Sequence, residues 1–314
     1  HIATHMLGQK SGTDLTFVPF KGGAEVLSAF VGGHITAVID GGWAQIEKQG
    51  KGRVLMTFQE KRIPRLPNVP TAREAGYDGV EVMGSEGYFI NQFLSQATNL
   101  RTDAWGGDYS HRMRLPVEIL ARMREAVGPD FIIIYRLSMI DLVPGGSAWD
   151  EIVTLGKAVA TGGANIVNTG IGWHEARVPT IATSVPRAAF AWVTQKMKAE
   201  FAAAGITTPL VTSNRINTPE VAEEVLASGA ADMVSMARPL LADPDFVRKA
   251  ARGQADQINT CIGCNQACLD HVFRNRLSSC LVNPQACHET ELIYRPLGPG
   301  VTARRMAVVG AGLS

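Results

Sequence analysis

Apolar runs and helical patterns alternate regularly along most of the chain. Short runs rich in Val and Ile are separated by stretches in which apolar residues recur with the 3.6-residue period of a helix. Strands that are apolar on both faces are typical of a parallel sheet covered by helices. The pattern predicts strands at 80–83, 131–136, 165–169, 210–213 and 233–236, and helices at 117–127, 149–160, 187–204 and 219–227.

Five strand–helix units in succession predict an α/β fold, namely the last five units of a (β/α)8 TIM barrel. Thr218 and Pro219 predict one helix start, as N-cap and first helical residue, and Asp243 with Pro244 predicts another. A shorter alternation of strands and helices in residues 1–79 predicts a small α/β segment before the barrel.

Composition excludes two classes of partner. The chain has 314 residues, with 30 Lys and Arg against 29 Asp and Glu, so its net charge of +1 argues against a nucleic-acid binder. No apolar stretch approaches the length that spans a membrane, so we expect no membrane partner. The chain begins with His1 and ends in an apolar run followed by Gly310 and Gly312, which indicates a piece of a longer protein.

All five cysteines lie near the C-terminus, in the spacing C-x2-C-x3-C-x11-C followed by one more. Three thiolates within eight residues can surround one face of a cluster, and a fourth returns after a loop. The spacing therefore favours an iron–sulfur cluster, with zinc and unligated thiols as the alternatives. Cys287 is the expected non-ligand among Cys261, Cys264, Cys268, Cys280 and Cys287.

Polar side chains follow the predicted strands, at the end of a barrel where catalysis takes place. The last two strands end in Arg215 and Arg238, a pair suited to a phosphate group. Each of these residues also has a purely structural interpretation. Arg136 and Arg215 could form structural ion pairs, Tyr88 could be a core residue whose hydroxyl is hydrogen-bonded, and His174 could be a buried, hydrogen-bonded histidine. The strand-end residues are Glu86, Tyr88, Arg136, His174, Glu175, Asn214, Arg215 and Arg238.

Several short sequence motifs of this chain also occur, in the same order, in one known family. They are VEVMGSEGY (80–88), WGGDY (105–109), IIIYRLS (132–138), NTGIGWHEAR (168–177), SMARP (235–239) and TCIGCNQAC (260–268). Through them, residues 80–314 resemble the bacterial 2,4-dienoyl-CoA reductases of the Old Yellow Enzyme group. The resemblance implies an FMN-binding barrel at 80–255, an iron–sulfur segment at 256–300 and the start of an FAD-binding domain at 301–314.

The resemblance also implies a cytoplasmic enzyme of unsaturated fatty-acid oxidation. Electrons would pass from NADPH through FAD and a 4Fe-4S cluster to FMN, and then as hydride to an acyl-CoA substrate. FAD and NADPH would bind in domains beyond this chain, and without the first three barrel strands we expect FMN to bind weakly. Tyr88 matches the proton donor and His174 its partner, since an imidazole stabilises the phenolate that a donating tyrosine leaves. FMN contacts would be Arg136, Arg215, Ala237 and Arg238, and cluster ligands Cys261, Cys264, Cys268 and Cys280.

Two positions depart from the wider group. The wider group has a His-x-x-Asn motif that binds the substrate carbonyl, and this chain has Met83-Gly84-Ser85-Glu86 in its place. The replacement favours the dienoyl-CoA branch over a general enone reductase. Ala97 stands where some members have a basic residue that contacts CoA.

Residues 1–79 resemble another family. The words FVPFKGGA (17–24), GGH (32–34), RLPNVPT (65–71) and EAGY (74–77) are similar to periplasmic solute-binding proteins of tripartite tricarboxylate transporters. Those proteins bind small carboxylates in an oxidising compartment, whereas a thiolate-held cluster belongs in a reducing one. Because residues 72–79 fit either family, we predict an artificial chimera. A periplasmic carboxylate-binding protein and a chain without stable function are the alternative interpretations.

Overall fold

The computed structural model describes residues 71, 74, 76–274 and 276–293. The elements predicted before residue 71 and the FAD-binding start at 301–314 lie outside the described residues. Within the part described, no helix combines the length and the apolar character needed to cross a membrane.

Five parallel strands form one sheet in the order of the sequence, as predicted. They are β1 (Gly79–Gly84), β2 (Ile132–Ile140), β3 (Ile166–Ile171), β4 (Leu210–Thr212) and β5 (Met233–Val234). The register pairs Gly79 with Ile132, Ile134 with Ile166, Val167 with Leu210, and Val211 with Met233. The sequential parallel order confirms the partial (β/α)8 barrel.

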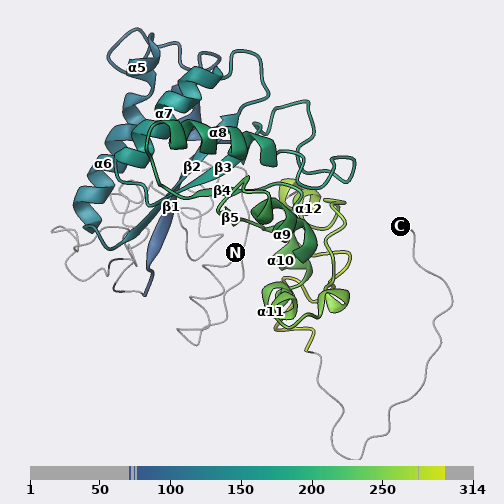
Figure 1. Cartoon of the computed structure of the whole chain (residues 1–314). Helices are drawn as coiled ribbons and strands as arrows, with labels where there is room; N and C mark the ends of the chain where they lie inside the picture. Colours follow the sequence, from purple (N-terminus) through teal and green to yellow (C-terminus); the bar gives the residue numbers. More distant parts are fainter. Residues whose placement is uncertain (1–70, 72–73, 75, 275, 294–314) are drawn as a thin grey trace, which may run out of the picture.

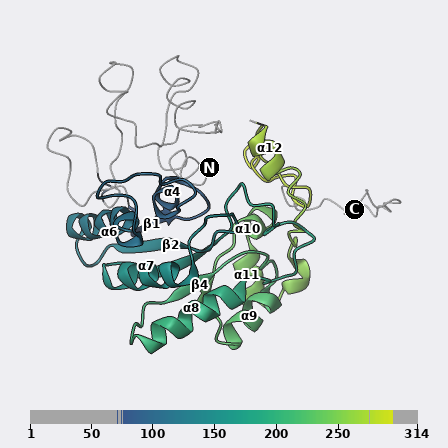
Figure 2. The same cartoon turned by 90° about the horizontal axis from the view of Figure 1, so that it is seen from above.

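Three long helices cover one face of this sheet: α6 (Arg114–Val127), α7 (Trp149–Thr161) and α8 (Ala191–Ala203) (Figures 1 and 2). Alternate residues of β2 point toward them, because successive side chains of a strand face opposite sides. Ile133, Tyr135, Leu137 and Met139 are almost completely buried there. The other face of the sheet carries the polar residues of the candidate site.

The connecting helices differ more from the prediction. α9 (Pro219–Ala227) begins as predicted, since the Thr218 hydroxyl accepts a hydrogen bond from the Val221 N–H at 3.4 Å. α11 (Phe246–Ala251) begins after Asp245, two residues later than predicted, because the Asp243 carboxylate instead accepts from the backbone of Asn259 and the side chain of Lys249.

Short helices were not predicted, because four to six residues are too few to show a helical period. They are α4 (Phe89–Leu94), α5 (Tyr109–Arg112), α10 (Arg238–Ala242) and α12 (Leu269–Phe273), together with the 3-10 turn η1 (Ala255–Gln257).

Candidate functional site

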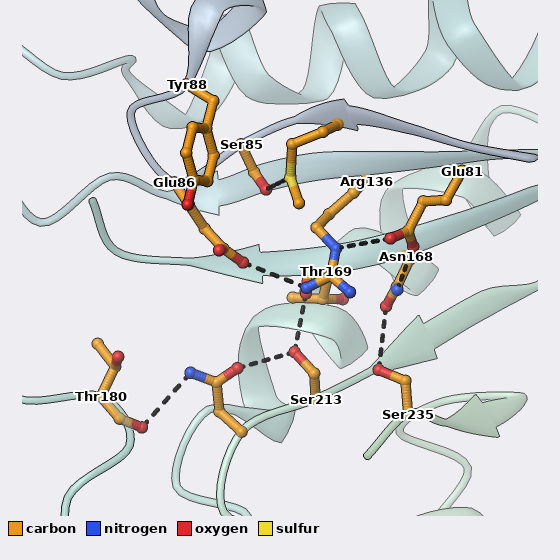
Figure 3. Close-up of polar contacts among 12 residues, drawn as sticks. Glu81, Ser85, Glu86, Tyr88, Arg136, Asn168, Thr169, Thr180, Ser213 and Ser235 are labelled. Atoms are coloured by element: carbon orange, nitrogen blue, oxygen red, sulfur yellow. Dashed lines mark hydrogen bonds and ion pairs between the residues drawn. The ribbon is translucent and has the colours of Figure 1, made fainter. Parts of the chain in front are cut away.

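A polar network crosses the face of the sheet opposite α6, α7 and α8 (Figure 3). Arg136 on β2 lies between two carboxylates, with Nε 3.2 Å from Glu81 Oε2 and Nη1 3.2 Å from Glu86 Oε1. On β3, Asn168 Nδ2 donates to Glu81 Oε1 at 2.6 Å, and Asn168 Oδ1 accepts from Ser235 Oγ at 3.4 Å. Arg136 thus forms structural ion pairs with both glutamates, which is one of the two interpretations that its position in the sequence allowed. Its Nη2 has no hydrogen bond within the described part of the chain and remains available to a ligand.

Tyr88 and His174 meet although 86 residues separate them. Tyr88 follows β1 and His174 follows β3, and the phenol oxygen lies 2.8 Å from the imidazole Nε2. The rings meet edge to face, with centroids 5.2 Å apart. The phenol is 47% exposed, so a substrate can reach it. The geometry therefore brings together the two residues predicted to act as donor and partner.

The surroundings of Tyr88 keep its proton in place. Partial burial raises the pKa of the phenol, and the nearby carboxylates of Glu86 and Glu175 raise it further, because each disfavours a second negative charge. The phenol is therefore protonated at neutral pH and can donate. It needs a neighbouring group that stabilises the phenolate once the proton has left.

Backbone conformation shapes the loop that carries Tyr88. Glu86 and Gly87 both have left-handed φ angles, 63° and 79°. A Cβ atom on Gly87 would lie 3.1 Å from the ring of Trp173, which precedes His174. The loops after β1 and β3 therefore pack directly on each other, and glycine permits the close approach.

Two arginines gather positive charge at the ends of β4 and β5. Asn214 and Arg215 are consecutive left-handed residues, with φ of 71° and 59°, a costly conformation that clusters at functional sites. Arg215 Nε donates to the Val185 carbonyl at 2.9 Å, and Arg238 Nη1 donates to Asn265 Oδ1. Neither arginine has a carboxylate partner among residues 71–293 as far as these are described, so the structural ion-pair interpretation fails for Arg215.

The two arginines also influence each other. Burial lowers the pKa of Arg215, and the charge of Arg238 lowers it further. A concentration of cations without counter-ions suits an anionic group such as a phosphate. Ala237, the third predicted contact here, is the N-cap residue of α10 and has only a methyl side chain, so it offers a ligand its backbone.

Four of the five cysteines line one cavity of about 320 Å³, a volume that includes space open to solvent. They are Cys261, Cys264, Cys268 and Cys280, the four predicted ligands, and Arg238 and Asn265 line the cavity beside them. Cys287, the predicted non-ligand, does not line it. All five thiols are free, and burial raises the pKa of Cys268 and raises that of Cys287 to about 11.

Thiols are the donors that both an iron–sulfur cluster and a zinc ion take. No three His, Cys, Asp or Glu side chains of the described residues converge closely enough to hold one metal ion. Four thiols around a common space, with a cation at its edge, suit the larger iron–sulfur group, whose ligands are spread over several iron atoms.

Hydrogen bonds attach the cysteine segment to the barrel loops. Asn217 Nδ2, after β4, donates to the Cys261 carbonyl at 2.7 Å, and Thr183 Oγ1 donates to the Ile262 carbonyl at 2.8 Å. The cysteine cavity and the arginine pair are therefore neighbours, and Arg238 belongs to both.

One polar residue beneath the Tyr–His pair was missed by the sequence analysis. Asp141 is 3% exposed and directly follows β2, which runs four residues beyond its predicted end. Pro144, Gly145 and Gly146 come just after it, and such turn residues mark a strand end. That signal could have identified Asp141 as a strand-end carboxylate.

Comparison with known proteins gives two family matches. Residues 69–257 match the NADH:flavin oxidoreductase / NADH oxidase family, and residues 1–91 match the tripartite tricarboxylate transporter family receptor. The two matches overlap at 69–91. The resemblance to the Old Yellow Enzyme group is therefore confirmed at the level of the family.

Relatives include reductases and oxidases that are much longer. A metal reductase of Desulforamulus reducens is 46% identical over 77% of this chain and 35% of its own length. An NADH oxidase of Thermoanaerobacter brockii is 36% identical over 77% of this chain and 36% of its own. The structure of 2-naphthoyl-CoA reductase with 2-naphthoyl-CoA superposes with a TM-score of 0.66 at 35% identity, covering 70% of this chain and 33% of that one.

This chain spans about a third of the length of these relatives. Within that third, the FMN-family match covers the whole parallel sheet and the loops that hold the Tyr–His pair and the arginines. The chain belongs to the NADH:flavin oxidoreductase / NADH oxidase family.

Proposed function

We propose that this chain is the FMN-binding part of a reductase that acts on 2,4-dienoyl-CoA thioesters. The hydrogen-bonded Tyr88–His174 pair at the carboxyl ends of the strands is the observation that carries the proposal. A relative of known structure holds a CoA thioester, 2-naphthoyl-CoA, which supports an unsaturated thioester as the substrate class. Because the chain spans about a third of its relatives, the proposal concerns the reduction of substrate and not the supply of electrons from NADPH and FAD.

The arginines supply the anion site of the cofactor. FMN, when bound, supplies a hydride to the far end of the conjugated system. Arg215 and Arg238 would hold its phosphate, since both lack carboxylate partners among the described residues. Arg136, held by two glutamates, would offer its remaining N–H groups to the cofactor from a fixed position.

Tyr88 completes the reduction by giving its proton to the α-carbon of the thioester. Hydride at the far end and a proton at the α-carbon leave one double bond between them, so the substrate gains two electrons and two hydrogens, one from the hydride and one from the phenol. His174, 2.8 Å away, donates to the phenolate as it forms and lowers the cost of that charge. The exposed phenol then recovers a proton from solvent.

The cysteine cavity is the proposed site of a 4Fe-4S cluster. Cys261, Cys264, Cys268 and Cys280 would hold it, and the cluster, when bound, accepts and passes on single electrons. Arg238, at the edge of the cavity, would offset part of the negative charge that four thiolates bring.

A carboxylate-binding protein is the second candidate, favoured by the family match of residues 1–91. One preparation distinguishes the two. The full chain is purified without oxygen in the presence of FMN, analysed for flavin, iron and sulfide, and then titrated with citrate. Flavin with iron and sulfide supports the reductase. A colourless protein that binds citrate contradicts it and supports the second candidate, and a protein that aggregates in every buffer contradicts both.

A further inference from the structure

Asp141 is a buried carboxylate without a cationic partner in the described part of the chain. It accepts four hydrogen bonds instead: from Ser138 Oγ at 2.6 Å, Trp173 Nε1 at 2.9 Å and Asn91 Nδ2 at 3.4 Å on Oδ1, and from the Ser147 N–H at 2.7 Å on Oδ2. Burying a charge costs free energy unless hydrogen bonds replace the lost water. Four donors directed at one buried side chain make Asp141 the common partner that fixes the positions of the groups around it.

Two of these donors lead to the Tyr–His pair. Asn91 Oδ1 accepts the N–H of Gly87 at 2.9 Å, and Gly87 is the residue immediately before the phenol. Trp173 is the residue immediately before the imidazole, and its backbone N–H also donates to the carbonyl of Asp141 at 2.9 Å. One carboxylate therefore links the two loops that carry the reactive side chains.

The pair needs such support because both of its members are exposed. Tyr88 is 47% exposed, and the hydrogen bond between the phenol and His174 lies at the surface. The loop before Tyr88 has two left-handed residues, a conformation that persists only where the surroundings impose it. Asn91 and Trp173 impose it from the buried side, since both are held by the same side chain.

We infer that Asp141 is a positioning residue that holds Tyr88 and His174 in register for proton delivery, through Asn91 on one side and Trp173 on the other. The inference rests on the proposed function of the pair. It gives the buried carboxylate a role in the reaction, although Asp141 touches neither the pair nor the substrate site.

A carboxylate suits this position and an amide does not. All four neighbours are donors, and an asparagine has one acceptor oxygen and an N–H2 group that is itself a donor. In either orientation of Asp141→Asn, the N–H2 would face a donor and push at least one loop away. A displacement of about 1 Å can slow catalysis about 100-fold.

The test is nitrogen NMR of the full chain with labelled histidine, in which His174→Gln assigns the signal of His174. Tyr88→Phe first defines the change that accompanies loss of the phenol hydrogen bond. We expect Asp141→Asn to reproduce that change, with the circular dichroism of the folded protein retained. Ser138→Ala is the matched control, because this buried hydroxyl donates to Asp141 but leads to neither loop, and it should leave the His174 signal in place.

Each other outcome overturns a defined statement. If Tyr88→Phe alters His174 and Asp141→Asn does not, or if Ser138→Ala has the same effect as Asp141→Asn, the positioning role is wrong and the proposed function stands. If Tyr88→Phe leaves His174 unchanged, the pair does not form and the proposed function fails with it. If Asp141→Asn does not fold, Trp173→Phe decides. It removes the indole N–H that donates to Asp141 together with part of the ring that lies beside Gly87, and an unchanged His174 signal then overturns the inference.

Discussion

Arg215 and Arg238 differ from Arg136, which lies in the middle of β2 and not at its predicted end, because no carboxylate neutralises them within the described residues. Arg136, by contrast, has two carboxylate partners. The sequence placed all three at strand ends but could not tell an ion-paired arginine from a free one. That distinction depends on the register, which sets Met83 of β1 beside Arg136 and so brings Glu81, two residues earlier on the same face, within reach.

Arg215→Gln should therefore weaken FMN binding. A hydrogen bond to a charged group contributes about 1.5–3 kcal/mol, so the dissociation constant should rise about 10- to 100-fold. Quenching of FMN fluorescence by the full chain measures it. Arg248→Gln is the control, since Arg248 is 66% exposed on α11 and already pairs with Asp245 at 3.0 Å. Equal affinities of the two variants would refute the anion site.

Helices of nine residues or more could be predicted from their period and strands from their apolar runs, whereas the shortest helices could not. The five strands and helices α6 to α9 lie close to their predicted positions, because their apolar residues repeat often enough to be read. α4 and α12, with six and five residues, are too short to show that period. The roles of Tyr88 and His174 were predicted through a family resemblance, whereas Asp141 was missed because the predicted strand ended four residues before β2 does.

The glycine turn before α4 can be tested by substitution. Gly87→Ala should destabilise the fold by more than about 1–2 kcal/mol, which is the cost of the left-handed conformation for an alanine. The added Cβ would also lie 3.1 Å from the Trp173 ring, which raises the cost further. Gly229→Ala is the matched control, with φ of 74° and nothing within 4 Å. Urea unfolding compares them, and a Gly87→Ala cost no larger than that of Gly229→Ala would argue against loop-to-loop packing at this point.

The lining of the cysteine cavity predicts which cysteine can be replaced without loss of the proposed cluster. Cys264→Ser removes a cavity-lining ligand and should abolish cluster binding, whereas Cys287→Ser removes a thiol outside the cavity and should retain it. Iron and sulfide analysis of both variants, purified without oxygen, is the measurement. Full iron content in Cys264→Ser would remove that residue from the ligand set.

At the scale of the whole molecule, two families meet in one chain. Both family matches include residues 69–91, the stretch that contains β1 and the start of the candidate site. The proposed thiolate-held cluster needs reducing conditions, whereas the transporter receptors that the N-terminal part resembles work in an oxidising compartment. We therefore expect the source DNA to lack an intact junction, which one long sequencing read across codons 60–100 would show. A continuous reading frame there would establish a genuine fusion.

The proposed role of Tyr88 is to protonate the substrate once the substrate has accepted a hydride from reduced FMN. The full chain, saturated with FMN and reduced without oxygen, is mixed rapidly with a 2,4-dienoyl-CoA while flavin absorbance is followed. We predict that the oxidised flavin spectrum returns, and that Tyr88→Phe slows its return about 100-fold, the usual contribution of a general acid. Chemical reduction of the flavin should be equal in both proteins, and Tyr77→Phe, which removes a phenol packed against the core, should behave as the wild type. Equal rates of reoxidation in the wild type and Tyr88→Phe would contradict the account.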